Sequence, residues 1–510
     1  MKTRCLIRRP VNIHFHIGIE EILLSLLLFV ILTAMLLTTD RRYLDFGDGV
    51  YLYISSKLLE GSVLYKDILT PQPPILFAIG AAILRIGYSW KTVRLFSIFL
   101  GLAISLLIYI ISVELFNNRR VALAASATYH MLPMCWQWGR SFQADSLVTF
   151  FSLLSFMFFK SFKNKRMIIA SIFSFFAIYS KYSFLPAIFF NVIYLSLRRR
   201  NLLKYYLTPL IMFGGSLLVY LNIYSAGGYL ENTIIHQLRA PGYPFNVSVD
   251  LTLDGLSQIF SEGGAFTFLS LMGILHLHTE MKNGAGYFLG YMLSLFAPFL
   301  LILRRGTGMY IFHPAEPFIA IFSAYFIFEL VAHYRKRVAS ITVRRNFQLS
   351  RLSFSTLMIV LSILSLYISP ITNLSFNQYI NYQRYYGWSN VKYVDIVTEI
   401  IENYTSRNDK ILSPPYFAFL TQRGLISDYY CDSWIWLILY RNGDRDAVRA
   451  VEEVSSILED RSIKLVIIDW RIAQIAPIYE VVRRNYIMVR SVVAYDMLEI
   501  YIPKSSSTKE

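Results

Sequence analysis

Charged residues are scarce in this chain: Asp, Glu, Lys and Arg make up 16% of its 510 residues, against about 25% in an ordinary soluble domain. Hydrophobic residues make up 55%, and the mean hydropathy is +0.46. A single soluble core stops growing at roughly 250–300 residues, so no globular interior absorbs this much apolar surface. The composition therefore excludes an ordinary soluble protein and indicates an α-helical polytopic membrane protein.

Cysteine is also scarce, with only Cys5, Cys135 and Cys431. No pair of them is indicated as a disulfide, and no Cys/His set has the spacing of a zinc site. The net charge of +16 would fit nucleic acid. However, Lys and Arg occur in short clusters between apolar runs, which is the pattern of cytoplasmic loops in membrane proteins. We therefore expect membrane lipid as a partner and no nucleic acid.

The apolar runs predict about eleven transmembrane helices, because a span needs about 20 mostly apolar residues. The expected spans are residues 19–39, 90–115, 121–138, 146–159, 167–182, 184–197, 205–224, 260–276, 286–303, 310–333 and 352–369. The first run is long for a cleavable signal peptide, and Thr38-Thr39-Asp40 is a poor cleavage site. We therefore expect it to remain as a span.

Basic residues set the expected orientation in the cell membrane. Those that precede the first span place the N-terminus in the cytoplasm: Lys2, Arg4, Arg8 and Arg9. Alternation then predicts cytoplasmic loops at residues 117–120, 160–166, 198–204, 277–285 and 334–351, which are rich in Lys and Arg. The glycosylation sequons at Asn246, Asn373 and Asn403 fall on expected outer segments.

One apolar stretch, residues 73–88, decides this alternation. It contains Arg85, spans only sixteen residues and starts at Pro73-Pro74, all of which favour a helix lying on the outer surface. The alternative is a further span, which would place the basic loops 160–166 and 198–204 outside. We reject that alternative because it contradicts the charge bias.

The composition changes beyond Pro370. We expect a transmembrane domain over residues 1–371, with large outer loops at 40–89 and 225–259, and a small extracytoplasmic α/β domain over 372–510. Its expected helices are 393–404, 447–461 and 476–485. Its expected strands are 409–412, 464–469 and a final hairpin of 488–493 and 497–502.

Acidic and aromatic residues crowd the first outer loop. The candidates there are Asp48, Tyr51, Tyr65, Lys66, Asp67 and Gln72. An outer carboxylate at the end of a span can serve as a base or a metal ligand. The alternative is that Asp45 and Asp48 only cap a helix over residues 49–59, since Asp is a favoured N-cap.

Two later outer segments carry further candidates. Arg140 and Asp145 lie at a lipid boundary, where charge is costly unless paired or wet; a snorkelling Arg and a capping Asp would also explain them. The other segment holds Arg304, Arg305, Tyr310 and His313. Arginine forks match phosphate geometry, although a misplaced cytoplasmic loop would also explain the two arginines.

The order of these segments resembles the GT-C class of polyprenol-phosphate-dependent glycosyltransferases, close to the protein O-mannosyltransferases and the lipid A aminoarabinose transferase (glycosyltransferase family 39-like). That family's first loop reads Asp-Glu-Gly-x-Tyr, Leu-x-x-Gly-x-x-x-Tyr-x-Asp and Lys-Pro-Pro. The corresponding residues here are Asp48-Gly49-Val50-Tyr51, Leu58-Leu59-Glu60-Gly61 with Tyr65 and Asp67, and Gln72-Pro73-Pro74. Asp145 matches a second outer carboxylate, and His313 to Pro317 resembles a His-Tyr-x-x-Pro-like element.

Two positions depart from the family pattern. Gly49 replaces the usual acid, so no cofactor is expected with certainty and a divalent metal is left open. Gln72 replaces the usual Lys, and Lys66 or Arg305 is expected to supply its phosphate contact.

The resemblance implies transfer of a sugar from a polyprenyl-phosphate donor to a protein, lipid or glycan acceptor on the extracytoplasmic face. Asp48 would be the catalytic base or would align the acceptor hydroxyl. Asp145 would hold the acceptor or order the first loop, and Arg304 and Arg305 would meet the leaving phosphate. The sequence has no nucleotide-binding fingerprint, as expected for chemistry outside the cell.

Two other functions remain open from the sequence: a transporter or flippase for a lipid-linked or small polar substrate, and a non-catalytic scaffold. A transporter would show mid-span ionisable residues and internal repeats. The sequence has few such charges and no clear repeat.

Overall fold

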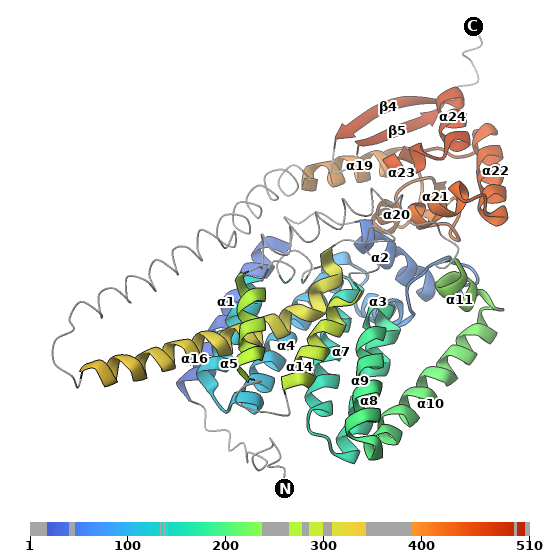
Figure 1. Cartoon of the computed structure of the whole chain (residues 1–510). Coiled ribbons are helices and arrows are strands. Elements are labelled where there is room, and N and C mark those ends of the chain that lie inside the picture. The colour runs from blue at the N-terminus through green and yellow to red at the C-terminus, as the bar shows by residue number, and fades with distance from the viewer. Residues whose placement is uncertain are drawn as a thin grey trace.

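The computed structural model describes residues 18–39, 46–132, 135, 139, 141–236, 265–277, 285–298, 309–342, 390–493 and 497–504. These residues form a bundle of helices with a smaller unit of helices and short strands, residues 390–504, packed against one end (Figure 1). We call this smaller unit the C-terminal unit.

The bundle helices are α1 (Ile19–Thr39), α4 (Trp90–Phe116), α5 (Arg119–Met131), α7 (Ala144–Phe159), α8 (Asn164–Ser180), α9 (Leu185–Arg198), α10 (Arg200–Tyr224), α14 (Ala285–Phe296) and α16 (Glu316–Thr342). A further helix covers residues 265–277. Each expected span up to residues 310–333 overlaps one of these helices, while 352–369 lies outside the described residues.

Within the described residues, four helices are long and apolar enough to cross a bilayer: Ile19–Leu37, Trp90–Phe116, Arg200–Tyr224 and Phe312–Tyr334. Several others are apolar but shorter, including Ala144–Phe159, Tyr182–Arg198 and Ala265–Leu277. The expected span 121–138 is wrong at its end, because α5 stops at Met131. Leu132 is extended (φ −77°, ψ 144°), as the residue before a proline prefers to be.

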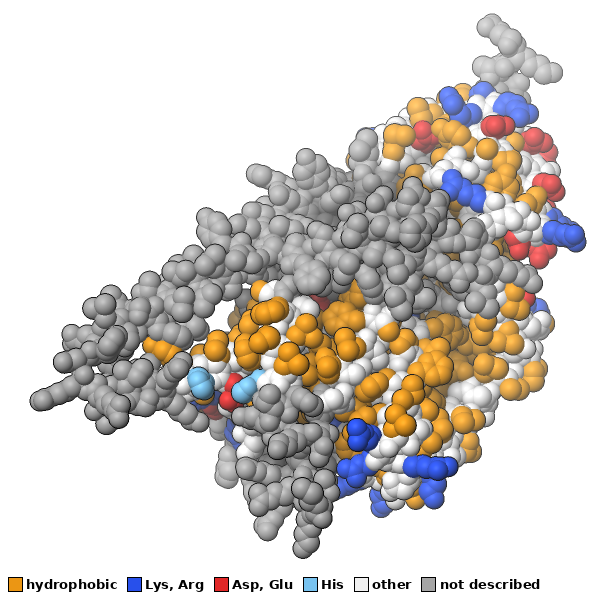
Figure 2. Space-filling view, viewed as in Figure 1, with side chains coloured by type: hydrophobic (Ala, Val, Ile, Leu, Met, Phe, Trp, Pro, Cys, Tyr) orange, Lys and Arg blue, Asp and Glu red, His pale blue; other side chains and the backbone are white. Residues whose placement is uncertain are grey.

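Apolar side chains cover the outer faces of the bundle, as contact with lipid requires. Phe29 on α1, Met212 on α10 and Phe189 on α9 are all more than half exposed. Figure 2 shows hydrophobic side chains along the helices and Lys and Arg gathered at the end farthest from the C-terminal unit. The exposed basic residues of the loops at that end are Lys163, Lys165, Arg166, Arg198, Arg199, Arg200 and Lys204.

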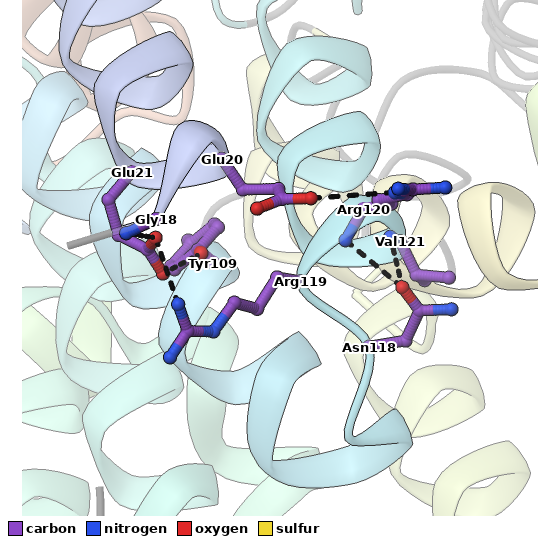
Figure 3. A network of polar contacts seen from close by, with 8 residues as sticks. All are labelled: Gly18, Glu20, Glu21, Tyr109, Asn118, Arg119, Arg120 and Val121. Carbon is purple, nitrogen blue, oxygen red and sulfur yellow. Dashed lines mark hydrogen bonds and ion pairs between the residues drawn. The ribbon is translucent and has the colours of Figure 1, made fainter. Parts of the chain in front are cut away.

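The beginning of α1 is tied to α4 and α5 by a network of polar contacts (Figure 3). Glu21 accepts hydrogen bonds from the Tyr109 hydroxyl at 2.7 Å and from Arg119 Nη1 at 3.1 Å. Glu20 lies 3.4 Å from Arg120 Nε. The expected basic loop 117–120 is therefore partly neutralised by the first helix of the bundle.

Two short helices lie between the bundle and the C-terminal unit: α2 (Phe46–Leu59) and α3 (Ile75–Ile86). With 12 residues, α3 rises only about 18 Å, short of the roughly 30 Å that a membrane crossing needs. It packs instead against α2, where a Cβ added at Gly80 would lie 2.3 Å from Ser55 Oγ. This packing agrees with the expectation that residues 73–88 lie on the surface, and their placement outside the membrane remains a prediction.

The remaining short elements of the first part are η1 (Tyr182–Phe184), α11 (Gly228–Leu230), η2 (Glu231–Ile235) and η3 (Met309–Ala315). The C-terminal unit contains α19 (Asn390–Tyr404), β1 (Lys410–Ile411), α20 (Pro415–Thr421), β2 (Gly424–Leu425), α21 (Ser433–Arg441), α22 (Arg445–Glu459), β3 (Val466–Ile468), α23 (Trp470–Ala473), α24 (Ala476–Asn485), β4 (Tyr486–Val493) and β5 (Met497–Pro503).

Two small sheets organise the C-terminal unit. Strand β5 lies between β3 and β4, antiparallel to both, with Tyr501 opposite Val466 and Met488. Strands β1 and β2 pair in parallel, and a bridge between Leu412 and Val466 joins the two sheets.

The hydrophobic core is continuous between the bundle and the C-terminal unit. One buried cluster includes Phe77 of α3, Leu147 of α7, Val397 of α19, Phe417 of α20 and Ile500 of β5. This shared core fixes the C-terminal unit on α2, the helix that carries the first candidate site residues.

Candidate functional site

Asp48 lies in the first turn of α2, which begins at Phe46, and its side chain is 1% exposed. Its Oδ1 accepts a hydrogen bond of 2.7 Å from the Phe142 backbone N–H. Its Oδ2 lies 3.4 Å from Nη2 of Arg94 on α4. The carboxylate thus connects three separate segments of the chain, which a residue that only caps its own helix would not do.

The partner of Asp48 is itself buried. Arg94 is 2% exposed, and its guanidinium lies 4.8 Å from the centre of the Trp90 ring. A buried carboxylate needs a compensating charge and hydrogen bonds, because burial otherwise disfavours the ionised form. Arg94 and the Phe142 N–H together supply both.

Asp145, the second expected carboxylate, is fully buried in the first turn of α7. Both of its oxygens lie 2.8 Å from Nζ of Lys181, which stands between α8 and η1. The two charges therefore neutralise each other at the end of their helices. Asp145 is therefore neither a solvent-exposed helix cap nor an unpaired charge.

His313 of η3 is also fully buried, and its Nε2 lies 3.0 Å from the Tyr129 hydroxyl at the end of α5. His130, which follows Tyr129 in the sequence, has its Nδ1 3.4 Å from Cys135 Sγ. Nδ1 of His313 and Nε2 of His130 make no hydrogen bond with any residue that the structure describes.

Three sequence segments that are far apart therefore meet around the connection from α5 to α7. Asp48 binds Phe142, which precedes Asp145 by three residues, and His313 binds Tyr129 at the other end of that connection. The structure thus brings Asp48, Asp145 and His313 to one region.

The other first-loop candidates have more local surroundings. Tyr65 has a positive φ of 67° and donates its hydroxyl hydrogen bond to the Gln72 carbonyl at 2.8 Å. Asp67 accepts from the Val63 N–H at 2.7 Å, and Lys66 is exposed. These contacts describe a folded loop, and the assignment of these residues to substrate binding remains a prediction.

Tyr51 places its ring edge-on to Phe77, with 5.9 Å between the ring centres. Arg140, Arg304 and Arg305 lie outside the described residues, and of Tyr310 only the backbone position in η3 is described. Their expected contacts with substrate therefore remain predictions too.

The departure from the family pattern at Gly49 has a structural reason. A Cβ added there would lie 2.3 Å from Cβ of Tyr416 on α20, so α2 and α20 approach too closely for any side chain. No acidic pair exists at this point, and among the described residues no group of three or more His, Cys, Asp or Glu is placed to hold a metal ion.

A further contact fixes α2 against the C-terminal unit. The Tyr53 hydroxyl donates to Asp428 and accepts from the Leu425 N–H at 2.9 Å. Burial, and then the charge of Asp428, raise the pKa of Tyr53 well above its usual range. Tyr53 therefore stays protonated and continues to donate.

Sequence reasoning missed Arg94, Tyr129 and Tyr53 as partners of the site. Lys181 was not named as the partner of Asp145 either. The available signal was the cost of an unpaired charge within an apolar helix, which indicates that Arg94 and Lys181 have partners. Which carboxylate pairs with which cation depends on helix packing.

Known proteins resemble this chain in part of its sequence and in nearly all of its fold. A family model described as dolichyl-phosphate-mannose-protein mannosyltransferase matches residues 71–224. No curated protein sequence matches the chain.

The solved structures give a wider comparison. ArnT from Cupriavidus metallidurans bound to undecaprenyl phosphate is similar with a TM-score of 0.62 at 12% identity, over 95% of this chain and 98% of that one. ArnT without ligand gives 0.60 at 12% identity, over 94% and 97%. The oligosaccharyltransferase of Archaeoglobus fulgidus, tethered with an acceptor peptide, gives 0.51 at 12% identity, over 94% and 74%.

These likenesses confirm the expected fold class of a helical membrane protein with a small C-terminal α/β region. The resemblance to polyprenol-phosphate-dependent glycosyltransferases is confirmed as well. The chain has the GT-C glycosyltransferase fold, and its residues 71–224 match the mannosyltransferase family model.

Proposed function

We propose that this protein is a membrane glycosyltransferase that moves a sugar from a polyprenyl-phosphate donor to an acceptor hydroxyl. The observation that carries the proposal is the buried Asp48 carboxylate, oriented by Phe142 and Arg94 within a GT-C fold. The donor class is supported by the ArnT structure with undecaprenyl phosphate. A protein acceptor is supported by the oligosaccharyltransferase with its peptide, and a lipid or glycan acceptor fits the fold equally.

In the proposed reaction, Asp48 accepts the proton of the acceptor hydroxyl. The hydroxyl oxygen then forms a bond to the anomeric carbon, and the bond from that carbon to the phosphate oxygen breaks. The lipid phosphate leaves with the electron pair of that bond. Oδ2 is the better placed oxygen for the proton, because its contact with Arg94 is long at 3.4 Å, whereas Oδ1 is held at 2.7 Å by an N–H group.

Asp145 has a positioning role in this proposal. Lys181 occupies both of its oxygens, so Asp145 fixes the start of α7 and, through Phe142, the orientation of Asp48. Arg140, Arg304, Arg305 and Tyr310 are proposed to surround the donor phosphate, where cations stabilise the departing charge. Asp48 is 1% exposed, so the acceptor reaches it only after neighbouring segments move.

The proposed orientation places this chemistry on the extracytoplasmic face of the cell membrane. The basic loops lie at the opposite end of the bundle from α2 and the C-terminal unit, and basic loops favour the cytoplasm. The N-terminus would then be cytoplasmic and the C-terminal unit extracytoplasmic.

The test replaces Asp48 by Asn and measures sugar transfer from polyprenyl-phosphate donors by the purified protein in lipid. Asn keeps the size of the side chain and its contact with Phe142 but cannot take the proton, so we expect transfer to fall at least a hundredfold. Asp395→Asn, at an exposed position on α19, is the matched control. Unchanged transfer by Asp48→Asn would overturn the role of Asp48, and no transfer by the unaltered protein with any such donor would overturn the proposed function.

A further inference from the structure

A cavity of about 270 Å³ lies between the second half of α2 and the C-terminal unit. The residues that line it include Lys57, Glu60, Tyr88, Arg407, Gln422 and Arg423. Asp48 does not line this cavity, and Lys57 follows it by nine residues, or about 13 Å along the helix. The cavity is therefore separate from the proposed catalytic carboxylate.

Arg407 supplies a cation without an internal partner. It is exposed, and it makes no hydrogen bond or ion pair within the described part of the chain. Lys57, by contrast, pairs with Glu60 at 2.9 Å and with Asp428 at 3.6 Å. The Lys57 charge in the cavity wall is thus paired within the protein. The Arg407 guanidinium makes no such pair in the described part of the chain and is available to bind a ligand.

Lys57 remains a charged part of that wall. Burial lowers the pKa of its ammonium, but the hydrogen bond with Glu60 and the charge of Asp428 outweigh burial and raise the pKa overall. Arg423 differs from Arg407 because its guanidinium is already hydrogen-bonded. Its Nε donates to the Thr405 hydroxyl at 3.2 Å, and its Nη2 donates to the Thr405 carbonyl at 2.8 Å. It shapes the wall and is not free to bind an anion.

An aromatic ring lies beside these cations. Tyr88 stacks on Phe419 with 5.3 Å between ring centres and an interplanar angle of 27°. Phe419 is 3% exposed and fixed in the core, whereas Tyr88 is 42% exposed. One face of the Tyr88 ring is thus supported and its remainder is accessible, an arrangement on which the C–H groups of a sugar ring can pack.

Neutral polar groups complete the wall. Gln422, in the left-handed region at φ 54°, ends α20 and brings an amide that both donates and accepts hydrogen bonds. Cavities for drug-sized ligands measure about 300–1,000 Å³, so this one suits a single small polar unit. A supported ring, a free guanidinium and an amide within such a volume match a sugar that carries an acid group.

We propose that this cavity binds one acidic sugar unit, with its carboxylate or phosphate on Arg407 and its ring on Tyr88. The site is a binding site only, and its occupation does not depend on the transfer reaction proposed above. A guanidinium binds a carboxylate or phosphate through charge-assisted hydrogen bonds, and the aromatic ring adds selectivity for a ring over a bare anion.

The experiment titrates the full-length protein, held in phosphatidylcholine nanodiscs, with methyl glucuronide, glucose 6-phosphate, methyl glucoside and inorganic phosphate. Calorimetry measures each affinity. We expect the two acidic sugars to bind at least tenfold more tightly than methyl glucoside and than inorganic phosphate. Arg407→Ala should weaken both acidic sugars at least tenfold and leave methyl glucoside unchanged.

The matched control is Arg445→Ala, which removes another exposed guanidinium from the same unit at a position away from the cavity. A second variant, Tyr88→Ala, should weaken acidic and neutral sugars by the same factor because both use the ring. Equal affinities for glucuronide and glucoside would overturn the proposal. So would an equal effect of Arg445→Ala and Arg407→Ala, or phosphate binding as tight as that of glucose 6-phosphate.

Discussion

At the scale of single residues, the candidate site is built from buried pairs of opposite charge. Asp48 with Arg94 and Asp145 with Lys181 each combine a carboxylate at most 1% exposed with a cation from another segment. Removing one member of such a pair costs more than removing both, because a lone buried charge has nothing to compensate it. This asymmetry makes the pairs testable.

The Asp145–Lys181 pair gives the first prediction at this scale. Lys181→Met should lower the free energy of unfolding by about 3–5 kcal/mol, because it leaves Asp145 buried and charged. The double variant Lys181→Met with Asp145→Asn should recover at least half of that loss. The measurement is denaturant unfolding in detergent, and simple additivity of the two single changes would contradict a direct pair.

At the scale of elements, α2 is fixed by its neighbours on both sides. Arg94 and Phe142 bind it from the bundle side through Asp48, and Tyr416 and Asp428 contact it from the C-terminal unit. The position of the carboxylate therefore depends on how closely α2 and α20 approach. That approach is set at Gly49.

Gly49→Ala tests this close approach. The added Cβ would lie 2.3 Å from Cβ of Tyr416, so the helices must move apart, and we expect a loss of about 1–3 kcal/mol in the free energy of unfolding, together with reduced transfer. The control is Gly215→Ala in α10, where an added Cβ meets nothing within 4 Å and where alanine favours the helix. Equal stability of the two variants would contradict a tight contact at Gly49.

A pH-dependent element lies farther along the C-terminal unit. Asp432 caps α21, accepting from the N–H groups of Trp434 and Ile435. Burial raises the pKa of its carboxyl from 3.8 to about 6, although the Ile435 N–H and nearby Arg471 favour the charged form. The folded chain thus holds this proton more tightly than the unfolded chain, so the stabilisation is complete below pH 3.8 and is lost as the pH rises through 6.

We therefore expect the opening free energy of α21, measured by hydrogen exchange in the full-length protein, to fall between pH 4 and pH 7. Asp432→Asn keeps a capping side chain but has no proton to lose, so the fall should disappear in this variant. Asp444→Asn, at the cap of α22, should leave the pH dependence of α21 in place. A fall that persists in Asp432→Asn would assign it to another group.

The boundaries of the helices and strands show how much of the secondary structure the local sequence predicts. Helices α1 and α24 begin and end at the residues that the sequence predicts, because α1 coincides with a long apolar run and α24 with an amphipathic pattern that starts beside a proline. Helices α20 and α21, of 7 and 9 residues, were not predicted, nor was the two-residue strand β2. Such short elements have little stability of their own and form because the surrounding core packs against them.

At the scale of the whole molecule, the two ends of the bundle differ in character. One end carries the exposed basic loops, and the other carries α2, α3 and the C-terminal unit (Figures 1 and 2). Because α3 has only 12 residues and packs against α2, we expect α2 and the start of α4 to belong to the same end. The proposed sidedness of the reaction follows from this arrangement together with the charge bias.

Reporters of membrane sidedness test the arrangement. An enzyme reporter that is active only outside the cell should work when fused after Ser89 and fail when fused after Arg166. The expected result has a direct reason, since the first position follows α3 and the second lies in a basic loop at the other end of the bundle. Activity after Arg166 would reverse the proposed orientation, and activity at both positions would contradict the number of crossings between them.

The sequence by itself determined the membrane class, most of the helices and a set of candidate residues for the chemistry. This was possible because apolar run length, charge bias and motif order can be identified from the sequence without a structure. On that basis Asp48, Asp145 and His313 could be named as candidates and placed on one side of the membrane, although their contact partners could not be named.

Only the tertiary structure decided what these residues contact. The Arg94 and Phe142 contacts of Asp48, the Lys181 partner of Asp145 and the approach of Tyr416 to Gly49 connect positions that lie between 36 and several hundred residues apart. Such contacts depend on how helices cross and pack, which no local pattern encodes. The sequence therefore identifies Asp48 as a candidate, whereas the fold determines that its carboxylate is buried and which groups it contacts.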